Sequence, residues 1–213
     1  MADADLLLIL GNKNLSSWSL RPWVLLRQAG IAFRERVLPF ETPGWREAIE
    51  ALSPSRRVPA LHHGDLVVWD SLAICEYVAE LDPAANLWPA DRAQRAIARA
   101  VSAEMHAGFP ALRRDMPMDL IANKAGQGHT AEALADARRV MAIWRDQLAV
   151  SKGPFLFGAF TIADAMFAPV TTRFTTYGVD LDETCRVYVD AVQALPAFVA
   201  WKRDAAAEPA TRP

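Results

Sequence analysis

The sequence predicts an α+β protein in which a mixed half of the form βαβαββα precedes a half made only of helices. Two observations carry this prediction. Strand signals, which are short apolar or alternating runs bounded by turn residues, occur only before residue 70, whereas apolar residues at three- and four-residue steps characterise the chain from Asp91 onward. The stretch between these regions breaks both patterns and contains Pro83 and Pro89. We therefore expect domains at residues 1–82 and 91–213, joined by a linker at residues 83–90.

Four strands and three helices are expected in the first half. The continuous apolar run at residues 6–10 is typical of a strand buried on both faces, and residues 33–38 alternate as a half-buried strand does. Two short apolar runs, at residues 59–63 and 66–69, flank Gly64-Asp65 and predict a hairpin. Helix starts and stops predict helices at residues 16–30, 45–52 and 70–81.

The second half is expected to be helical throughout. Apolar spacing and breaking residues predict five helices, at residues 91–109, 130–149, 162–172, 183–194 and 196–206. The helix at residues 162–172 is the most apolar and should lie in the core. The chain from Glu208 onward is expected to fray.

Composition excludes several classes of protein. Hydrophobic residues make up 52% of the chain, which is too many for a disordered protein. The net charge of -2 argues against a nucleic-acid binder that neutralises phosphates. No stretch approaches the roughly 20 apolar residues of a membrane helix, and the first residues lack the basic region of a signal peptide. We expect a cytoplasmic protein without nucleic-acid or membrane partners.

Cysteine and histidine usage argues against two kinds of site. Cys75 and Cys185 are the only cysteines and lie far apart, so no CxxC redox motif exists. None of the four histidines has metal-ligand spacing to another histidine or to a cysteine, so no metal is expected.

Two local features sit where a ligand could bind, and each also has a purely structural explanation. Ser16 and Ser17 begin a helix, where free N–H groups and the helix dipole favour an anion such as a thiolate; a plain N-cap is the alternative. Asp70 and Ser71 begin another helix and could take an ammonium and a carboxylate, with capping again the alternative.

Two further features concern the backbone. Pro59 follows Val58 just before a strand; a cis bond there would turn the Val58 backbone outward, where a peptide could add as a strand. The alternative is an edge-strand proline without function. Thr161 and Asp164 have capping-box spacing at the start of the apolar helix, and we interpret them as structural.

Together these features resemble the soluble glutathione transferase superfamily, over nearly the whole chain. The matching stretches are residues 58–61 (its cis-proline motif), 70–77 (its γ-glutamyl-binding element) and 158–164 (its folding motif in the helical half). The resemblance implies a thioredoxin-like first domain, a helical second domain, and glutathione as co-substrate without a metal. Residues 16–21, Ser-Ser-Trp-Ser-Leu-Arg, are similar to the SSCS-x-R signature of the zeta class, except that Trp18 replaces the cysteine.

The resemblance also implies a role for each motif residue. Ser16, with Ser17 as the second choice, would activate the glutathione thiol. Val58, after which Pro59 follows, would pair with the cysteinyl backbone. Ser71 would meet the γ-glutamyl carboxylate, and Asp70 its ammonium. Arg57 would bind the glycyl carboxylate, with Arg56 as the second choice.

The implied activity is transfer of the glutathione thiolate to a small hydrophobic electrophile. The electrophile pocket is expected to include Trp18, Met105, His106 and Phe109, although a Met/Phe stripe is more often core. Two alternatives stay open: a glutathione-dependent cis–trans isomerase of the maleylacetoacetate type, and a non-catalytic transferase-like interaction module. The resemblance also implies a homodimer.

Overall fold

A computed structural model describes residues 5–40 and 42–209 of the chain. Its first half contains a four-stranded sheet in the order β2-β1-β3-β4. Strand β1 (Leu6–Leu10) pairs parallel with β2 (Arg34–Val37) and antiparallel with β3 (Ala60–His63), which forms a hairpin with β4 (Leu66–Trp69). This arrangement confirms the predicted strands, and the fully apolar one lies inside the sheet, between β2 and β3.

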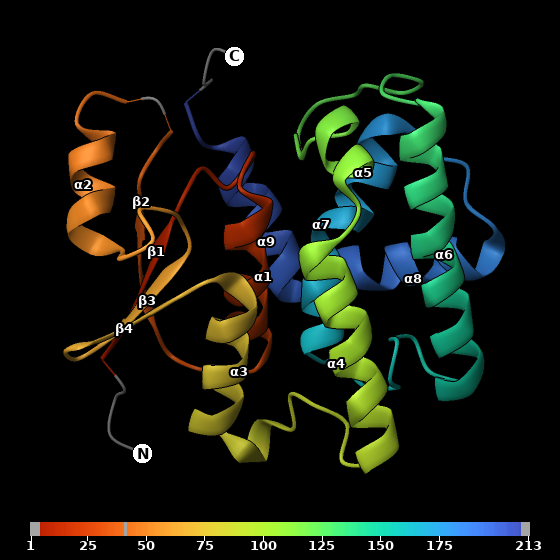
Figure 1. Cartoon of the computed structure of the whole chain (residues 1–213), viewed down its shortest axis with the longest axis horizontal. Coiled ribbons are helices and arrows are strands. Elements are labelled where there is room, and N and C mark those ends of the chain that lie inside the picture. Colours follow the sequence, from red (N-terminus) through yellow and green to blue (C-terminus); the bar gives the residue numbers. More distant parts are fainter. Residues whose placement is uncertain (1–4, 41, 210–213) are drawn as a thin grey trace.

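Helices cover both faces of this sheet. Helices α1 (Ser17–Gln28) and α3 (Ser71–Leu81) pack together on the face toward the helical half, and α2 (Trp45–Leu52) covers the opposite face (Figure 1). Under α2 lies a small separate core of four buried residues: Ile9, Leu38, Ile49 and Ala60. The βαβαββα order is thus the predicted one.

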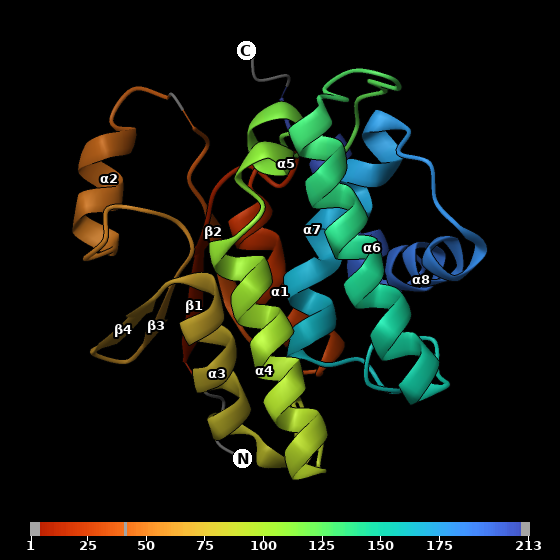
Figure 2. The ribbon, with the colours of Figure 1, turned by 45° about the vertical axis from the view of Figure 1, so that its right-hand side comes forward.

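The second half is a bundle around α7 (Ile162–Tyr177), in which every residue except Thr175 is buried. Figure 2 shows α4 and α6 in front of α7. The other helices of this half are α4 (Arg92–Ala107), α5 (Pro110–Asp115), α6 (Ala131–Ser151), α8 (Glu183–Gln193) and α9 (Pro196–Ala206), after a short 3₁₀ helix, η1 (Pro83–Ala85). Among the described residues, no helix is long and apolar enough to cross a membrane.

The two halves share a core. Helix α1 packs on α7 and α9, and one hydrophobic cluster runs from the strands through these helices. The domain boundaries at residues 82 and 91 stay a prediction about folding units.

Several helix ends differ from their predicted positions, and the ends of α4 and α7 show the physical reasons. The helix expected at residues 91–109 ends at Ala107, because Phe109 adopts a left-handed conformation and Pro110 starts α5. Helix α7 continues five residues past Thr172 and ends before Gly178, which is left-handed. Threonines have low helix propensity, but in the extension the hydroxyls of Thr175 and Thr176 donate to the carbonyls of Thr171 and Asp119, each at 3.0 Å.

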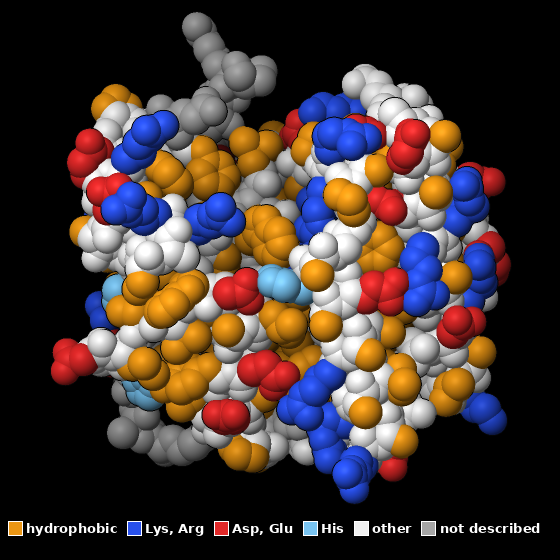
Figure 3. Space-filling view, viewed as in Figure 1, with side chains coloured by type: hydrophobic (Ala, Val, Ile, Leu, Met, Phe, Trp, Pro, Cys, Tyr) orange, Lys and Arg blue, Asp and Glu red, His pale blue; other side chains and the backbone are white. Residues whose placement is uncertain are grey.

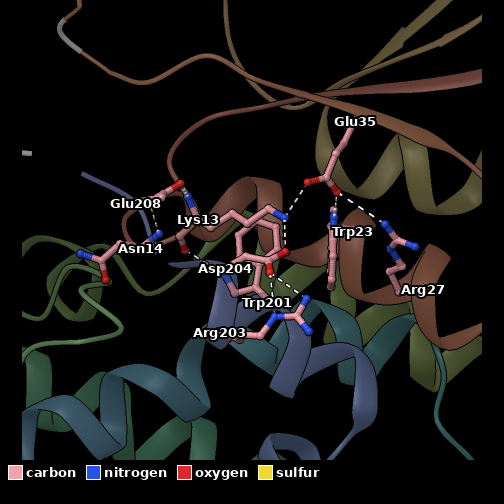
Figure 4. A network of polar contacts seen from close by, with 9 residues as sticks. All are labelled: Lys13, Asn14, Trp23, Arg27, Glu35, Trp201, Arg203, Asp204 and Glu208. Carbon is pink, nitrogen blue, oxygen red and sulfur yellow. Dashed lines mark hydrogen bonds and ion pairs between the residues drawn. The ribbon is translucent and has the colours of Figure 1, made fainter. Parts of the chain in front are cut away.

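The loop between β1 and α1 is held by the C-terminal end of the chain (Figure 4). Lys13, 3% exposed, forms ion pairs of 2.6 Å with Glu35 and 2.8 Å with Asp204. The Glu208 carboxylate accepts hydrogen bonds from the backbone N–H groups of Lys13 (2.6 Å) and Asn14 (3.1 Å). The expectation that the chain frays from Glu208 is therefore wrong for Glu208 itself; residues 210–213 lie outside the described residues.

Candidate active site

A cavity of about 560 Å³ lies between the two halves. Figure 3 shows apolar side chains along this seam, with Lys and Arg side chains on both sides of it. The lining residues come from four segments: the start of α1 with the two residues before it, the chain between β2 and β3, the end of α5 with the residues after it, and α7. They are Leu15, Ser16, Ser17, Trp18, Phe40, Trp45, Arg57, Val58, Arg113, Pro117, Met118 and Arg173.

The two serines at the start of α1 both border the cavity but differ in their hydrogen bonds. Ser16 is the N-cap: its oxygen accepts the N–H of Ser19 at 3.3 Å, and its hydroxyl lies 2.7 Å from the Ser19 hydroxyl. Ser19 in turn accepts the N–H of Gly11, which anchors the helix start to the end of β1. The Ser17 hydroxyl has no hydrogen-bond partner within the described residues, so it is the free donor beside the cavity.

The peptide bond between Val58 and Pro59 is cis. Val58 lines the cavity and precedes β3, outside the paired strand residues. Arg57 is exposed and also lines the cavity, whereas Arg56 turns to an ion pair with Glu50 at 3.4 Å. The structure thus brings Arg57 and Val58 to the same cavity as the serine pair.

Asp70 and Ser71 start α3 next to the cavity rather than in its wall. One Asp70 oxygen caps the N–H groups of Leu72 (2.9 Å) and Ala73 (3.2 Å), and the other lies 3.0 Å from Nε2 of His106 on α4. The Asp70 side chain accepts no hydrogen bond from the N–H of Ser71, the first residue of the helix. The Ser71 hydroxyl is buried and accepts a long hydrogen bond, 3.4 Å, from Arg21.

The residues predicted for the electrophile pocket are separated by the fold. Trp18 is half-buried and lines the cavity. The ring of His106 packs edge-on against the ring of Trp18, with 5.3 Å between the two ring centres. His106 is held by Asp70, and burial is the main cause that lowers its pKa, so the ring is neutral near pH 7. Met105 and Phe109 are buried in the core and are not among the lining residues.

Sequence reasoning missed the cavity residues that lie outside motifs. Phe40 and Trp45 form one wall, and the Phe40 N–H donates to the Asn12 side chain at 2.7 Å. Gly11 allows Phe40 to approach, because a Cβ at position 11 would lie 2.3 Å from that ring. Arg113, Met118 and Arg173 come from the helical half. The one available signal was Arg173, a cationic residue directly after the apolar helix predicted at residues 162–172.

Neither cysteine takes part in this site. Cys75 is fully buried on α3, and burial raises the pKa of its thiol. Burial together with nearby Asp182 raises the pKa of Cys185 to about 12. Both thiols are therefore protonated and unreactive near neutral pH. Within the described residues, no group of three or more His, Cys, Asp or Glu side chains is arranged to hold a metal ion.

Two family models match the chain. The one described as "Glutathione S-transferase, N-terminal domain" matches residues 15–81, and the one described as "Glutathione S-transferase, C-terminal domain" matches residues 127–202. Together they cover the serine pair, the cis-proline segment, the start of α3 and all of α7.

Curated relatives and solved structures agree with these matches. A probable maleylacetoacetate isomerase of Caenorhabditis elegans is 26% identical over 87% of this chain and 88% of that protein. The maleylacetoacetate isomerase of Rattus norvegicus is 27% identical over 71% of this chain and 70% of that protein. A Burkholderia glutathione transferase homologue, solved with bound glutathione, has a TM-score of 0.75 at 24% identity and covers 96% of this chain and 100% of that chain. The chain belongs to the glutathione S-transferase family.

Proposed function

We propose that this chain is a serine-type glutathione transferase, which activates the glutathione thiol at the start of α1 and transfers it to an electrophile in the adjoining cavity. The observation that supports this most is the free hydroxyl of Ser17 at the positive end of a helix and at the wall of a cavity. A free thiol has a pKa of about 8.5, so it is mostly protonated at pH 7. A hydroxyl hydrogen bond and the helix dipole both stabilise the thiolate and lower that pKa.

Glutathione would lie along the first half of the chain. Its cysteinyl backbone would pair with the N–H and C=O of Val58, in the manner of an added strand. The γ-glutamyl carboxylate would bind at the free N–H of Ser71 and the start of α3. Asp70 would take the ammonium on the oxygen that faces His106, and Arg57 the glycyl carboxylate.

The transfer step needs no further reagent. The thiolate sulfur forms a bond to an electrophilic carbon; the electron pair of the broken bond leaves with a leaving group, or, in an addition, carbon takes a proton from solvent. The cavity would hold the electrophile against Trp18, Phe40 and Trp45, which exclude water from one side.

Two measurements test this proposal. The protein should be retained on immobilised glutathione, and it should conjugate glutathione to 1-chloro-2,4-dinitrobenzene faster than the uncatalysed reaction. Absence of both would refute a transferase and support the third possibility, a transferase-like interaction module without catalysis.

A glutathione-dependent cis–trans isomerase of the maleylacetoacetate type is the second candidate. Two relatives are named as maleylacetoacetate isomerases, which favours it. Trp18, in place of the signature cysteine, argues against it. An assay with maleylacetone decides: turnover at a rate that exceeds conjugation would make isomerisation the main activity.

We also propose that the protein is cytoplasmic and acts as a homodimer, which is the family's usual state. Light scattering at micromolar concentration tests the assembly: a mass of one chain, 23.5 kDa, would refute the dimer.

A further inference from the structure

Three arginines gather at the cavity, and two of them contact the ring of Trp18. Arg113 on α5 and Arg173 on α7 line the cavity, while Arg21 is fully buried behind it. The guanidinium groups of Arg21 and Arg113 lie 4.4 Å and 4.8 Å from the centre of the Trp18 ring. Three positive charges thus gather where the electrophile is proposed to bind.

These guanidinium groups are incompletely hydrogen-bonded. Nη2 of Arg21, Nη1 of Arg113 and Nη1 of Arg173 are each buried without a partner within the described residues. Their other hydrogen bonds go to neutral oxygens: Arg21 and Arg173 donate Nε to the carbonyls of Met166 (3.2 Å) and Met116 (2.9 Å). Buried donors of native proteins are nearly always paired, so three orphaned nitrogens in one place indicate a missing acceptor.

No carboxylate neutralises the cluster directly. None of the ion pairs among the described residues includes Arg21, Arg113 or Arg173, and no described lining residue is Asp or Glu. Asp70 acts on Arg21 and Asp136 acts on Arg113 through space only. Burial and the neighbouring Arg113 lower the pKa of Arg173 to about 9, which leaves it charged at pH 7. A buried charge without a partner is costly, so a ligand anion would relieve it.

We infer that the electrophile of this enzyme is an anion, an apolar or aromatic molecule with a carboxylate that binds between Arg113 and Arg173. This inference rests on the proposed transferase function and narrows its substrate class. The carboxylates of glutathione are assigned to Ser71 and Arg57, in the first half, whereas Arg113 and Arg173 belong to the helical half. A guanidinium fork matches the two oxygens of a carboxylate, and Trp18, Trp45 and Met118 offer apolar contact to the body of the molecule.

The test uses two chloroarenes that differ by one carboxylate: 1-chloro-2,4-dinitrobenzene and 4-chloro-3,5-dinitrobenzoate. In both, the glutathione sulfur bonds to the ring carbon and chloride leaves with the electron pair of the C–Cl bond. For each compound, kcat/KM is divided by the rate constant of its uncatalysed reaction with glutathione. The measured quantity is the ratio of these two normalised values, that of the carboxylate compound over that of the neutral compound. We expect a ratio of about 10 or more in the wild type, since a charged hydrogen bond contributes roughly 10- to 100-fold.

Variants assign this preference to the cluster. Arg113→Gln and Arg173→Gln should each lower the ratio about tenfold or more. Arg114→Gln is the matched control on the same helix, because Arg114 is exposed and pairs with Asp115 at 2.7 Å; its ratio should stay as in the wild type.

A binding measurement covers the case in which Arg173→Gln does not fold. Calorimetry of the glutathione-saturated wild type and of Arg113→Gln with unreactive 3,5-dinitrobenzoate should show binding that is weakened in the variant and by added salt. A wild-type ratio near one, or equal ratios in Arg113→Gln and Arg114→Gln, overturns the anionic substrate. No turnover of either chloroarene together with no glutathione binding would instead overturn the transferase itself.

Discussion

Two helix starts of this chain are capped by side-chain oxygens but differ in what surrounds them. At the start of α7, the Asp164 carboxylate is fully buried and accepts from the backbone N–H groups of Leu156 and Thr161, and from the hydroxyls of Thr161 and Tyr188. At the start of α1, Ser16 caps the helix, but the adjacent Ser17 hydroxyl has no partner within the described residues and borders a cavity.

The difference lies in what stands beyond each helix end. Helix α7 begins against the core, so every polar group there must be satisfied by the protein itself. Helix α1 begins at the seam between the halves, where the dipole and a free hydroxyl can act on a ligand. A capped helix start is therefore structural or functional according to its surroundings, and the two can be told apart by mutation.

The largest effect is expected from removing the satisfied cap. Asp164→Ala would leave four buried donors without an acceptor and should lower the free energy of unfolding by about 3–5 kcal/mol. Urea denaturation measures it. Tyr188→Phe, which removes only one donor of the four, is the control and should cost about 1 kcal/mol. A loss below 1 kcal/mol in Asp164→Ala would contradict the structural role.

The same carboxylate should give stability a measurable pH dependence. Burial raises the pKa of Asp164 from 3.8 to about 6, so the folded state holds its proton more tightly than the unfolded state. The stability that this proton binding contributes is therefore fully present below about pH 4. It declines as the pH rises from about 4 to about 6, and no further loss occurs above about pH 6. The total is on the order of 2–3 kcal/mol.

Asp164→Asn removes this titration but keeps the size of the side chain. The difference in unfolding free energy, wild type minus Asp164→Asn, should fall between pH 4 and pH 6. A difference that is flat over this range would show that the carboxyl titrates normally.

At the start of α1, where we propose that the thiol is activated, a substitution of Ser17 should change the activity rather than the stability. Ser17→Ala should lower kcat/KM for conjugation about 100-fold, or about 2.7 kcal/mol, with an unchanged melting temperature. The ultraviolet absorbance of bound thiolate, followed against pH, should show a raised thiol pKa in this variant.

Ser16→Ala is the matched comparison. It removes the N-cap and should cost about 1 kcal/mol of stability, because the Ser16 oxygen accepts the N–H of Ser19. Full activity of Ser17→Ala beside an inactive, folded Ser16→Ala would assign the thiol to Ser16, as the family resemblance implies.

The smallest effect is expected from the clamp on the loop before α1. Glu208→Gln keeps one acceptor for the N–H groups of Lys13 and Asn14 but loses the charge, and should cost about 0.5–1 kcal/mol of stability. We expect kcat/KM to fall a few-fold, since this loop positions Ser16 and Ser17. Lys202→Gln, an exposed residue of α9, is the control. Equal values for both variants would show that the clamp does not position the loop.

Much of the fold was predictable because its signals are local. The apolar run of β1, the Gly64-Asp65 turn and the caps of α3 and α7 each depend on residues within a few positions of one another. The end of α7 was predicted too early because the apolar run on which the prediction rested stops before Arg173, and burial against neighbouring helices carries the helix on to Tyr177.

The candidate site was predictable only in its first half. Ser16, Ser17, Arg57 and Val58 belong to motifs, and the cavity brings them together. Arg113 and Met118 carry no motif, and their place at the cavity depends on how α5 packs against α6. Met105 and Phe109 both lie on the helix predicted at residues 91–109, but in the core rather than at the cavity.

The sequence by itself determined the order of strands and helices, the helix caps and the family, because periodicity, capping and short motifs act between neighbouring residues. Only the tertiary structure decided which helix start opens on a cavity, that three arginines meet there without a counter-charge, and that Glu208 holds the loop before α1. These features join segments as far as 195 residues apart, and such contacts depend on the packing of the whole chain rather than on any local pattern.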